Sequence, residues 1–161
     1  MTLNIVILAL VTLQRVGELW LARRNTQRLL ARGAHEHAPG HYPLIVAVHT
    51  LWLISLWLLA LSRPVDGFFL GLFIFIELCR IWVLATLGPR WTTRIIILPD
   101  APLVQRGPYR LVNHPNYWVV VGEIAVLPLV FGLWQVALVF TLLNAAILTI
   151  RIREENRALD R

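Results

Sequence analysis

Residues 105–117 have the sequence QRGPYRLVNHPNY, the most polar and turn-rich stretch in an otherwise apolar chain. Its two prolines, Pro108 and Pro115, disfavour helical geometry at the residue that precedes each, and so they fix the path of the chain. Pro115 suits the first turn of a following helix, where a missing N–H has no cost. Free backbone donors at that helix start, beside His114 and Tyr117, would favour an anionic group. The residues alone leave an ordinary polar loop as the alternative.

The composition indicates a polytopic membrane protein. A hydrophobic fraction of 58% and a mean hydropathy of +0.67 over 161 residues are too high for a soluble domain. All 15 basic residues are arginines, and they lie between apolar segments, so the positive-inside rule explains the net charge of +6 better than a nucleic-acid partner does. The single cysteine, Cys79, excludes a disulfide framework and a cysteine-based metal site.

Apolar segments predict one all-α integral membrane domain, residues 1–161, with about five transmembrane helices. The expected spans are at about 3–21, 43–62, 68–87, 117–130 and 133–150. The fourth segment is short and contains Pro128, so together with the fifth it predicts a tight C-terminal helical hairpin that turns near Phe131 and Gly132. Trp52 and Trp57 are expected to be interface anchors of the second span. Three tryptophans around the long connection are expected to join an interfacial belt, with a lipid-access groove as the alternative: Trp82, Trp91 and Trp118.

The distribution of arginine predicts the orientation. The connection after the first span, the long connection at 88–116 and the tail at 151–161 are rich in arginine, whereas the other two connections are nearly bare. With five spans, these three regions lie on one side of the membrane, which the positive-inside rule assigns to the cytoplasm. We therefore expect the N-terminus outside, the C-terminus in the cytoplasm, and residues 105–117 beside the tail.

Six ionisable residues lie within the predicted spans: Arg15, Glu18, His49, Glu77, Arg80 and Glu123. Such groups are costly in a bilayer and usually face the interior of the bundle. The arginine and glutamate of the first span are three residues apart, as are those of the third, so each pair shares a helix face. Internal Arg–Glu pairs that tie spans together are favoured over a proton or ion path.

Two further groups bear on chemistry. The spacing of His35, His37 and His41 would suit a metal ion, but glycine and proline interrupt the segment and no cysteine supports it, so we predict no metal site. Arg151 and Glu155 are four residues apart and share a helix face where the last span leaves the membrane. An exposed surface pair is the ordinary interpretation of this spacing. The topology, however, places the pair beside residues 105–117, where an arginine can bind an anionic headgroup or a carboxylate in a fork.

The chain resembles the isoprenylcysteine carboxyl methyltransferase family of small membrane methyltransferases, whose motif is typically G-x-Y-x-x-x-R-H-P-x-Y followed, after a hairpin, by R-x-x-x-E. The matching residues cover roughly the C-terminal half: Gly107-Pro108-Tyr109-Arg110, His114-Pro115-Asn116-Tyr117, and Arg151-Ile152 followed by Glu154-Glu155 and Leu159. Asn113 departs from the motif, which usually has arginine at this position. The change alters the contacts that an anion could make next to His114. The N-terminal half resembles a bacterial branch, some members of which are thought to methylate lipidic polyketides such as alkylpyrones.

The resemblance implies S-adenosyl-L-methionine as methyl donor, bound without a Rossmann domain in a cytoplasmic pocket between the long connection and the last helix. It also implies a bacterial inner-membrane location. Carried over by position, the cofactor-binding residues would be Leu103, Val104, Tyr109, His114, Pro115, Asn116, Tyr117 and Glu155. The catalytic residues would be Arg151 and Glu155, with Arg151 holding the anionic oxygen of the acceptor.

The predicted function is therefore S-adenosylmethionine-dependent O-methylation of a lipid-like acceptor, at an alkylpyrone, phenolic or carboxylate oxygen. A carboxylate is already ionised at neutral pH, whereas a phenol would need deprotonation, assisted by His114 or Glu123. One alternative changes the acceptor to a prenylcysteine carboxylate. The alternative from another class is a small membrane transporter or assembly protein. Such a protein would not bind the cofactor, and its activity would depend on Glu77 or Glu123 more than on His114. The sequence does not define the acceptor or the oligomeric state.

Overall fold

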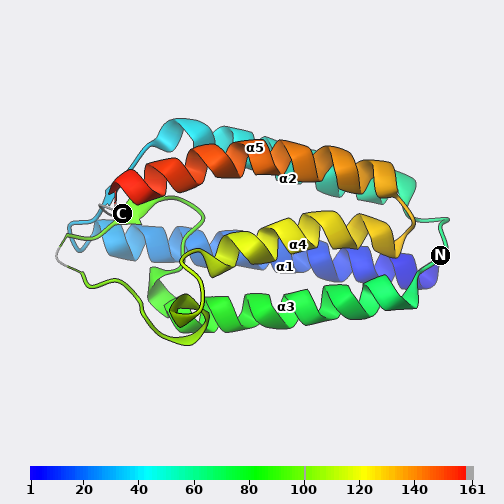
Figure 1. Ribbon diagram of the computed structural model, residues 1–161, viewed down its shortest axis with the longest axis horizontal. Helices are drawn as coiled ribbons and strands as arrows, with labels where there is room; N and C mark the ends of the chain where they lie inside the picture. Colours follow the sequence, from blue (N-terminus) through cyan, green and yellow to red (C-terminus); the bar gives the residue numbers. More distant parts are fainter. Residues whose placement is uncertain (100, 159–161) are drawn as a thin grey trace.

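Five helices run along the length of the molecule in the computed structural model, which describes residues 1–99 and 101–158. They are α1 (Thr2–Leu30), α2 (Tyr42–Leu59), α3 (Gly67–Leu87), α4 (Pro115–Val130) and α5 (Trp134–Ala158). The start of α1 and the end of α5 lie at opposite ends of the bundle (Figure 1). The α1–α2 connection, the α3–α4 connection and the end of α5 meet at one end, called the basic end below, as the arginine distribution predicted. Leu159 of the tail motif lies outside the described residues.

Four of these helices are long and apolar enough to cross a membrane: α1, α2 with the preceding turn η1 (Pro39–His41), α3 and α5. Their outer faces expose large apolar side chains such as Leu58 and Phe68, each 76% exposed, as lipid-facing surfaces do. The remaining helix, α4, has 16 residues, fewer than the roughly 20 that a span needs. The all-helical membrane fold predicted from composition is confirmed, with α4 as its short member.

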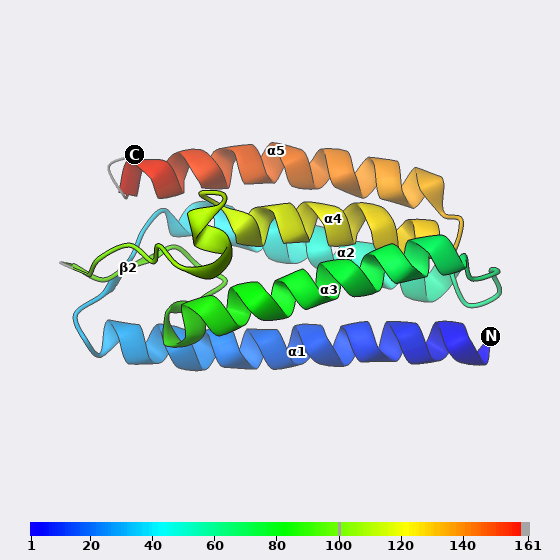
Figure 2. The same cartoon turned by 60° about the horizontal axis from the view of Figure 1, so that its bottom comes forward.

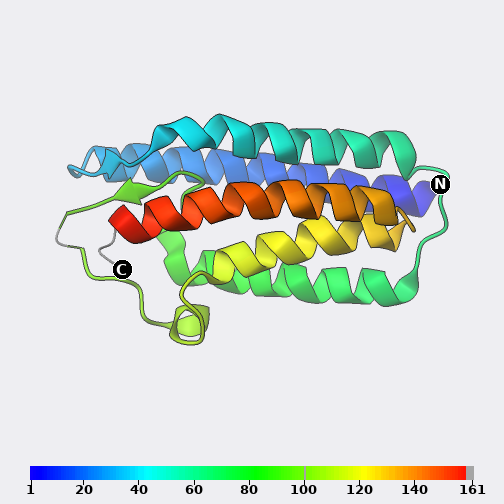
Figure 3. The same ribbon diagram turned by 45° about the horizontal axis from the view of Figure 1, so that its top comes forward.

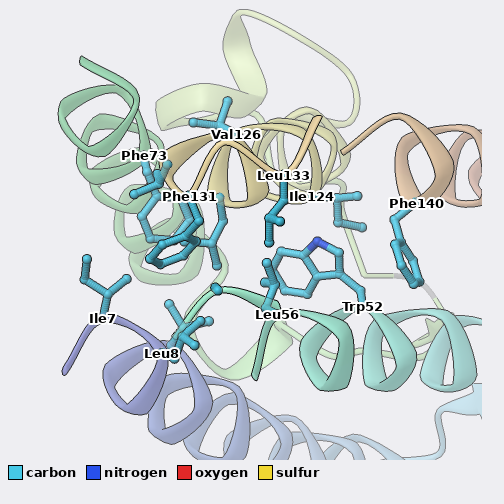
Figure 4. Packing of buried hydrophobic residues seen from close by; sticks show 14 residues of the cluster. Ile7, Leu8, Trp52, Leu56, Phe73, Ile124, Val126, Phe131, Leu133 and Phe140 are labelled. Atoms are coloured by element: carbon cyan, nitrogen blue, oxygen red, sulfur yellow. The ribbon is translucent and has the colours of Figure 1, made fainter. Parts of the chain in front are cut away.

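The apolar core lies toward the end of the bundle opposite the basic end, where α1, α2, α3 and α4 converge. Leu8, Leu56 and Phe131 are fully buried there and belong to one apolar cluster with Trp52, which is 1% exposed (Figure 4). The expectation that Trp52 lies at the membrane interface is therefore wrong. Trp57 also packs inward, because its indole N–H donates to the hydroxyl of a threonine in α1 at 3.0 Å.

The turn between α4 and α5 confirms the predicted hairpin. Pro128 stands in the last turn of α4, and its carbonyl accepts the N–H groups of Phe131 at 3.1 Å and Leu133 at 2.9 Å. Gly132 has a φ of +66°, a conformation that glycine adopts without strain. Pro128 therefore ends the helix instead of interrupting it.

The α3–α4 connection is more ordered than the sequence predicted. It contains two short helical turns, η2 (Gly88–Arg90) and η3 (Gly107–Arg110), and the short strand β2 (Ile96–Ile97). This strand pairs antiparallel with β1 (His35–Glu36) of the α1–α2 connection, so that the two connections form one structure at the basic end (Figure 2). Strands of two residues carry no detectable alternation of polarity, which explains why the sequence indicated only a loop.

Buried ion pairs join three helices near the middle of the bundle. The guanidinium of Arg80 (α3) binds both oxygens of the Glu123 carboxylate (α4) and lies 3.1 Å from an oxygen of Glu18 (α1). Arg15 lies 3.0 Å from Glu18 and 2.8 Å from Glu123. The interpretation of these residues as internal pairs is confirmed. Glu77, however, binds a glutamine side chain of α1 rather than Arg80.

Gly107 holds η3 against α3, and its replacement by alanine is expected to lower the free energy of unfolding by about 1–3 kcal/mol. Its φ is +56°, and an added Cβ would lie 2.6 Å from the hydroxyl oxygen of Thr86. Gly40→Ala is the control, because Gly40 has an ordinary φ and open space around its Cα. Thermal unfolding in detergent measures both variants, and equal stability would show that η3 does not depend on this contact.

Candidate functional site

A pocket of about 210 Å³ opens at the basic end, between the α3–α4 connection, the start of α4 and the last turns of α5. All but one of the predicted site residues line it: Leu103, Val104, Tyr109, His114, Asn116, Tyr117, Arg151 and Glu155. Pro115 is the exception, since it is buried in the first turn of α4 and shapes the helix start without lining the pocket. The motif residues therefore line one concavity, although they come from two distant parts of the chain. Figure 3 shows that the start of α4 and the end of α5 reach the same end of the bundle.

The start of α4 places the motif residues. His114 occupies the N-cap position and Pro115 the first turn, as the sequence predicted. The N–H groups of Tyr117 and Trp118 point back to the carbonyl oxygen of His114, at 3.1 and 3.5 Å. The bond from Trp118 is the ordinary first bond of an α-helix, but the bond from Tyr117 occupies one of the donors that were expected to be free at the helix start.

Tyr117 links α4 to α5 through its hydroxyl group. The hydroxyl donates to the carboxylate of Glu155 and accepts a hydrogen bond from Nε of Arg151 at 2.8 Å. The guanidinium carbon of Arg151 also lies 5.5 Å from the centre of the tyrosine ring, and Arg151 is only 7% exposed. The predicted pair of Arg151 and Glu155 is thus joined by a tyrosine at the pocket wall and is not a surface pair.

His114 completes this network. Its ring stacks on that of Tyr117, with centroids 5.3 Å apart and an interplanar angle of 17°. Its Nε2 lies 3.1 Å from the side-chain oxygen of Asn156, and its Nδ1 lies 3.8 Å from an oxygen of Glu155. Asn156 could not be recognised from the sequence, because only its position after Glu155 distinguishes it.

Tyr109 lines the same pocket and feels the charge of the same carboxylate. Burial raises the pKa of the Tyr109 hydroxyl above its ordinary value, and the negative charge of Glu155 raises it further. The phenol therefore stays neutral throughout the physiological pH range, so it can act as a hydrogen-bond donor to a ligand but not as a base.

Two polar atoms in the pocket wall are buried and have no hydrogen-bond partner among residues 1–99 and 101–158. They are Oδ1 of Asn116, an acceptor, and Nε1 of Trp91, a donor. Trp91 is 3% exposed, so its expected place in an interfacial belt is wrong, whereas Trp82 and Trp118 are exposed as a belt requires. Buried polar groups without partners are uncommon in native proteins, and here they point to a ligand or ordered water.

The far wall of the pocket comes from residues 92–98, which carry no recognisable motif. Arg94 lies in this segment, and its guanidinium donates to both oxygens of Glu36 at 2.8 and 2.9 Å and stacks 4.3 Å from the ring centre of Tyr42. His37 lies 3.5 Å from Glu154 on α5. The α1–α2 connection thus supports the pocket, although its charged residues gave no sign of this in the sequence.

Two side chains of the histidine-rich segment have charged partners elsewhere in the protein. Glu36 is bound to Arg94, and His37 faces Glu154. Within the described part of the chain, no group of three or more histidine, cysteine, aspartate or glutamate side chains is arranged to hold a metal ion. A second, polar cavity adjoins the pocket and shares with it Val104, Tyr109 and Asn113, the residue that departs from the family motif.

Comparison with known proteins places this geometry in a family. The model of the isoprenylcysteine carboxyl methyltransferase (ICMT) family matches residues 69–161, which include α4, α5 and most of the pocket. The uncharacterized protein YpbQ of Bacillus subtilis is 35% identical over 159 residues, or 96% of this chain and 95% of that protein. An uncharacterized protein of Haemophilus influenzae is 25% identical over 152 residues, or 91% of this chain and 88% of that protein. No solved structure matches. The chain therefore belongs to the isoprenylcysteine carboxyl methyltransferase family of membrane methyltransferases.

Proposed function

We propose that the protein transfers a methyl group from S-adenosyl-L-methionine to an oxygen of a lipid-like acceptor, either an alkylpyrone or phenol or a carboxylate. The observation that carries this proposal is the joined network of His114, Tyr117, Arg151 and Glu155 on the wall of one pocket at the basic end. The network brings a carboxylate, a guanidinium and aromatic rings together in a chain that belongs to a methyltransferase family.

The pocket has the chemical groups that this cofactor needs. A carboxylate and aromatic faces attract a sulfonium cation, and Glu155 lies beside the rings of Tyr109 and Tyr117. The partnerless atoms of Asn116 and Trp91 offer one acceptor and one donor to the polar edge of a ligand. Leaving such groups buried and unpaired costs about 1–3 kcal/mol each, a cost that a bound ligand would remove.

The cofactor supplies an activated methyl group, and the chain has to align the acceptor and exclude water. In the displacement, the acceptor oxygen forms a bond to the methyl carbon while the carbon–sulfur bond breaks. Arg151 is suited to hold the acceptor, because Tyr117 binds its Nε while its terminal nitrogens make no hydrogen bond to the described residues. Two parallel N–H groups match a carboxylate or an enolate oxygen well.

A phenolic acceptor would also need a base. Glu123 is unsuited to this role, because it is 1% exposed and bound by Arg80 and Arg15. His114 borders the pocket and is the better placed of the two groups that the sequence suggested as bases. An acceptor that is already ionised would need neither.

The positive-inside rule supports a cytoplasmic position for the basic end, with the N-terminus outside. The named relatives are both bacterial, which favours a bacterial inner membrane. Protein prenylation is not expected in bacteria, so a lipid acceptor is favoured over a prenylcysteine. The pairing of Arg80 and Arg15 with Glu18 and Glu123 counts against a transporter that would use these groups as an ion path.

Titration of the detergent-purified protein with S-adenosylhomocysteine, by calorimetry, tests the proposal directly. Saturable binding is expected. A folded sample that binds neither this compound nor S-adenosylmethionine would refute the enzyme assignment and favour the transporter alternative.

In the same titration, His114→Ala is expected to weaken binding of S-adenosylhomocysteine by at least about tenfold, since the variant loses the stacking on Tyr117 and the contacts to Asn156 and Glu155. His35→Ala is the control, because His35 is an exposed histidine at the same end of the molecule. Unchanged affinity in the His114 variant would show that the cofactor site has been placed wrongly.

A further inference from the structure

The last turns of α1, together with the turn that follows at Arg32, carry an unusual concentration of exposed positive charge. Four arginines follow the predicted end of the first span, and all four are exposed: Arg23, Arg24, Arg28 and Arg32. None of them forms an ion pair with a carboxylate among residues 1–99 and 101–158. Elsewhere in the described chain several arginines do bind carboxylates, namely Arg15, Arg80, Arg94 and Arg157.

The charge follows an apolar surface along the same helix face. Val16, Trp20, Arg24 and Arg28 are spaced by four residues, so they form one ridge on the outside of α1. Val16 is 59% exposed and Trp20 is 64% exposed, and the guanidinium of Arg24 lies 5.6 Å from the ring centre of Trp20. The order of aliphatic, tryptophan and then arginine side chains is that of a helix passing from acyl chains to headgroups.

The buried side of the same turns, next to the arginines, builds the pocket. Asn25 is 2% exposed, and its amide donates to the carbonyls of Gly88 at 3.2 Å and Trp91 at 2.9 Å, where the α3–α4 connection begins. Leu29 is buried and lines the pocket together with Trp91. These two helical turns therefore have a basic outer face and an inner face that forms pocket wall.

We propose that the arginine ridge at the end of α1, defined as Arg23, Arg24 and Arg28 of the helix with Arg32 of the turn that follows, binds the phosphate groups of anionic phospholipids, and that the bound lipid stabilises the pocket wall behind it. Guanidinium groups bind phosphate oxygens in a bidentate manner, and an anionic leaflet attracts clustered arginines next to a span. The occupant is a lipid of the surrounding bilayer, because the ridge continues directly into lipid-facing surface at Trp20 and Val16. Lipid binding of this kind does not depend on methyl transfer.

The test uses the full chain in nanodiscs of phosphatidylcholine, with or without phosphatidylglycerol, and no cofactor. Native mass spectrometry is expected to show preferential retention of phosphatidylglycerol by the wild type, and thermal unfolding is expected at a higher temperature in the anionic discs. Arg24→Gln with Arg28→Gln should weaken that retention by about 30-fold and remove the thermal response. Glutamine preserves helix propensity at these exposed positions, so the variant should fold.

Arg153→Gln with Arg157→Gln is the matched control, because it removes the same charge from α5 at the same end of the molecule. It should retain the lipid preference. An equal loss in both variants, or equal retention of the two lipids by the wild type, would overturn the proposal. Release of the lipid by inorganic phosphate at low concentration would also overturn it, since the ridge would then be a site for a soluble anion.

A second readout connects the lipid to the pocket and rests on the proposed function. Affinity for S-adenosylhomocysteine is expected to be higher in anionic than in neutral discs for the wild type, and equal in the two for the α1 double variant. Equal affinity for the wild type in both discs would refute the coupling. Lipid preference without any cofactor binding would refute the proposed function and leave the lipid site standing.

Discussion

Arg151→Ala is expected to reduce kcat/KM for methyl transfer by about 10²–10³-fold, with little change in affinity for S-adenosylhomocysteine. The side chain is buried at the pocket wall, and Tyr117 holds it through Nε alone. Alanine removes the terminal nitrogens that would bind the acceptor oxygen, but leaves the hydrogen bond between Tyr117 and Glu155 in place. The loss should therefore fall on the acceptor side of the reaction.

The assay uses radiolabelled S-adenosylmethionine with long-chain alkylpyrones, alkylphenols and S-prenylcysteines as acceptors, beside calorimetry with S-adenosylhomocysteine. Arg151→Lys should recover only part of the activity, because lysine keeps the charge but cannot contact Tyr117 and the acceptor at once. Arg153→Ala, an exposed neighbour on α5, is the control and should be fully active. Parallel loss of cofactor affinity and turnover in Arg151→Ala would show that Arg151 belongs to the cofactor site.

Much of the candidate site could be predicted because it lies in two short motifs. The two prolines and the single glycine of residues 105–117 fix the local backbone, and the spacing of Arg151 and Glu155 fixes a helix face. The alternating direction of the five helices then brings both to one end of the bundle. Trp91 and Arg94 could not be found in this way, because their roles depend on how two connections pair at β1 and β2.

The limit of prediction within the bundle has a different cause. Each membrane helix is itself hydrophobic on every face, so the sequence cannot distinguish a lipid-facing position from a core position. Trp52 illustrates this, since tryptophan is a residue type typical of membrane interfaces but Trp52 is buried in the core. The partner of Arg80 is a second case. Spacing suggested Glu77 on the same helix, whereas the packing of α4 against α3 brings Glu123 to it.

Glu123→Ala is expected to lower the free energy of unfolding by about 3–5 kcal/mol, a larger loss of stability than the one expected for Gly107→Ala. Glu123 is 1% exposed and neutralises Arg80, which is 3% exposed, and Arg15. Without it, two guanidinium groups share the single carboxylate of Glu18 inside an apolar bundle. Unfolding in detergent titrated with sodium dodecyl sulfate, followed by circular dichroism, measures the change.

Glu154→Ala is the control for this measurement. Glu154 pairs with Arg157 at 2.7 Å, but the arginine side chain is 72% exposed, so the loss should be below about 1 kcal/mol. A similar loss in both variants would mean that water or lipid reaches the cluster and screens its charges.

Removal of both charges separates the energy of pairing from the cost of burial. Arg80→Met with Glu123→Leu takes the central pair out of the bundle and leaves Arg15 with Glu18, which lie 3.0 Å apart. The double variant should therefore be more stable than Glu123→Ala, because no guanidinium remains without a carboxylate.

The single variants Arg80→Met and Glu123→Leu complete a double-mutant cycle. The cycle gives the coupling free energy between the two side chains, which is expected to be above about 1 kcal/mol. Additive losses would mean that the two groups act independently, as separately titrating sites in an ion path would, and would revive the transporter alternative. A large coupling would instead show that this ion pair holds α4 against α3. The first turn of α4 positions His114 and Tyr117 at the pocket, so the pair would also support the site.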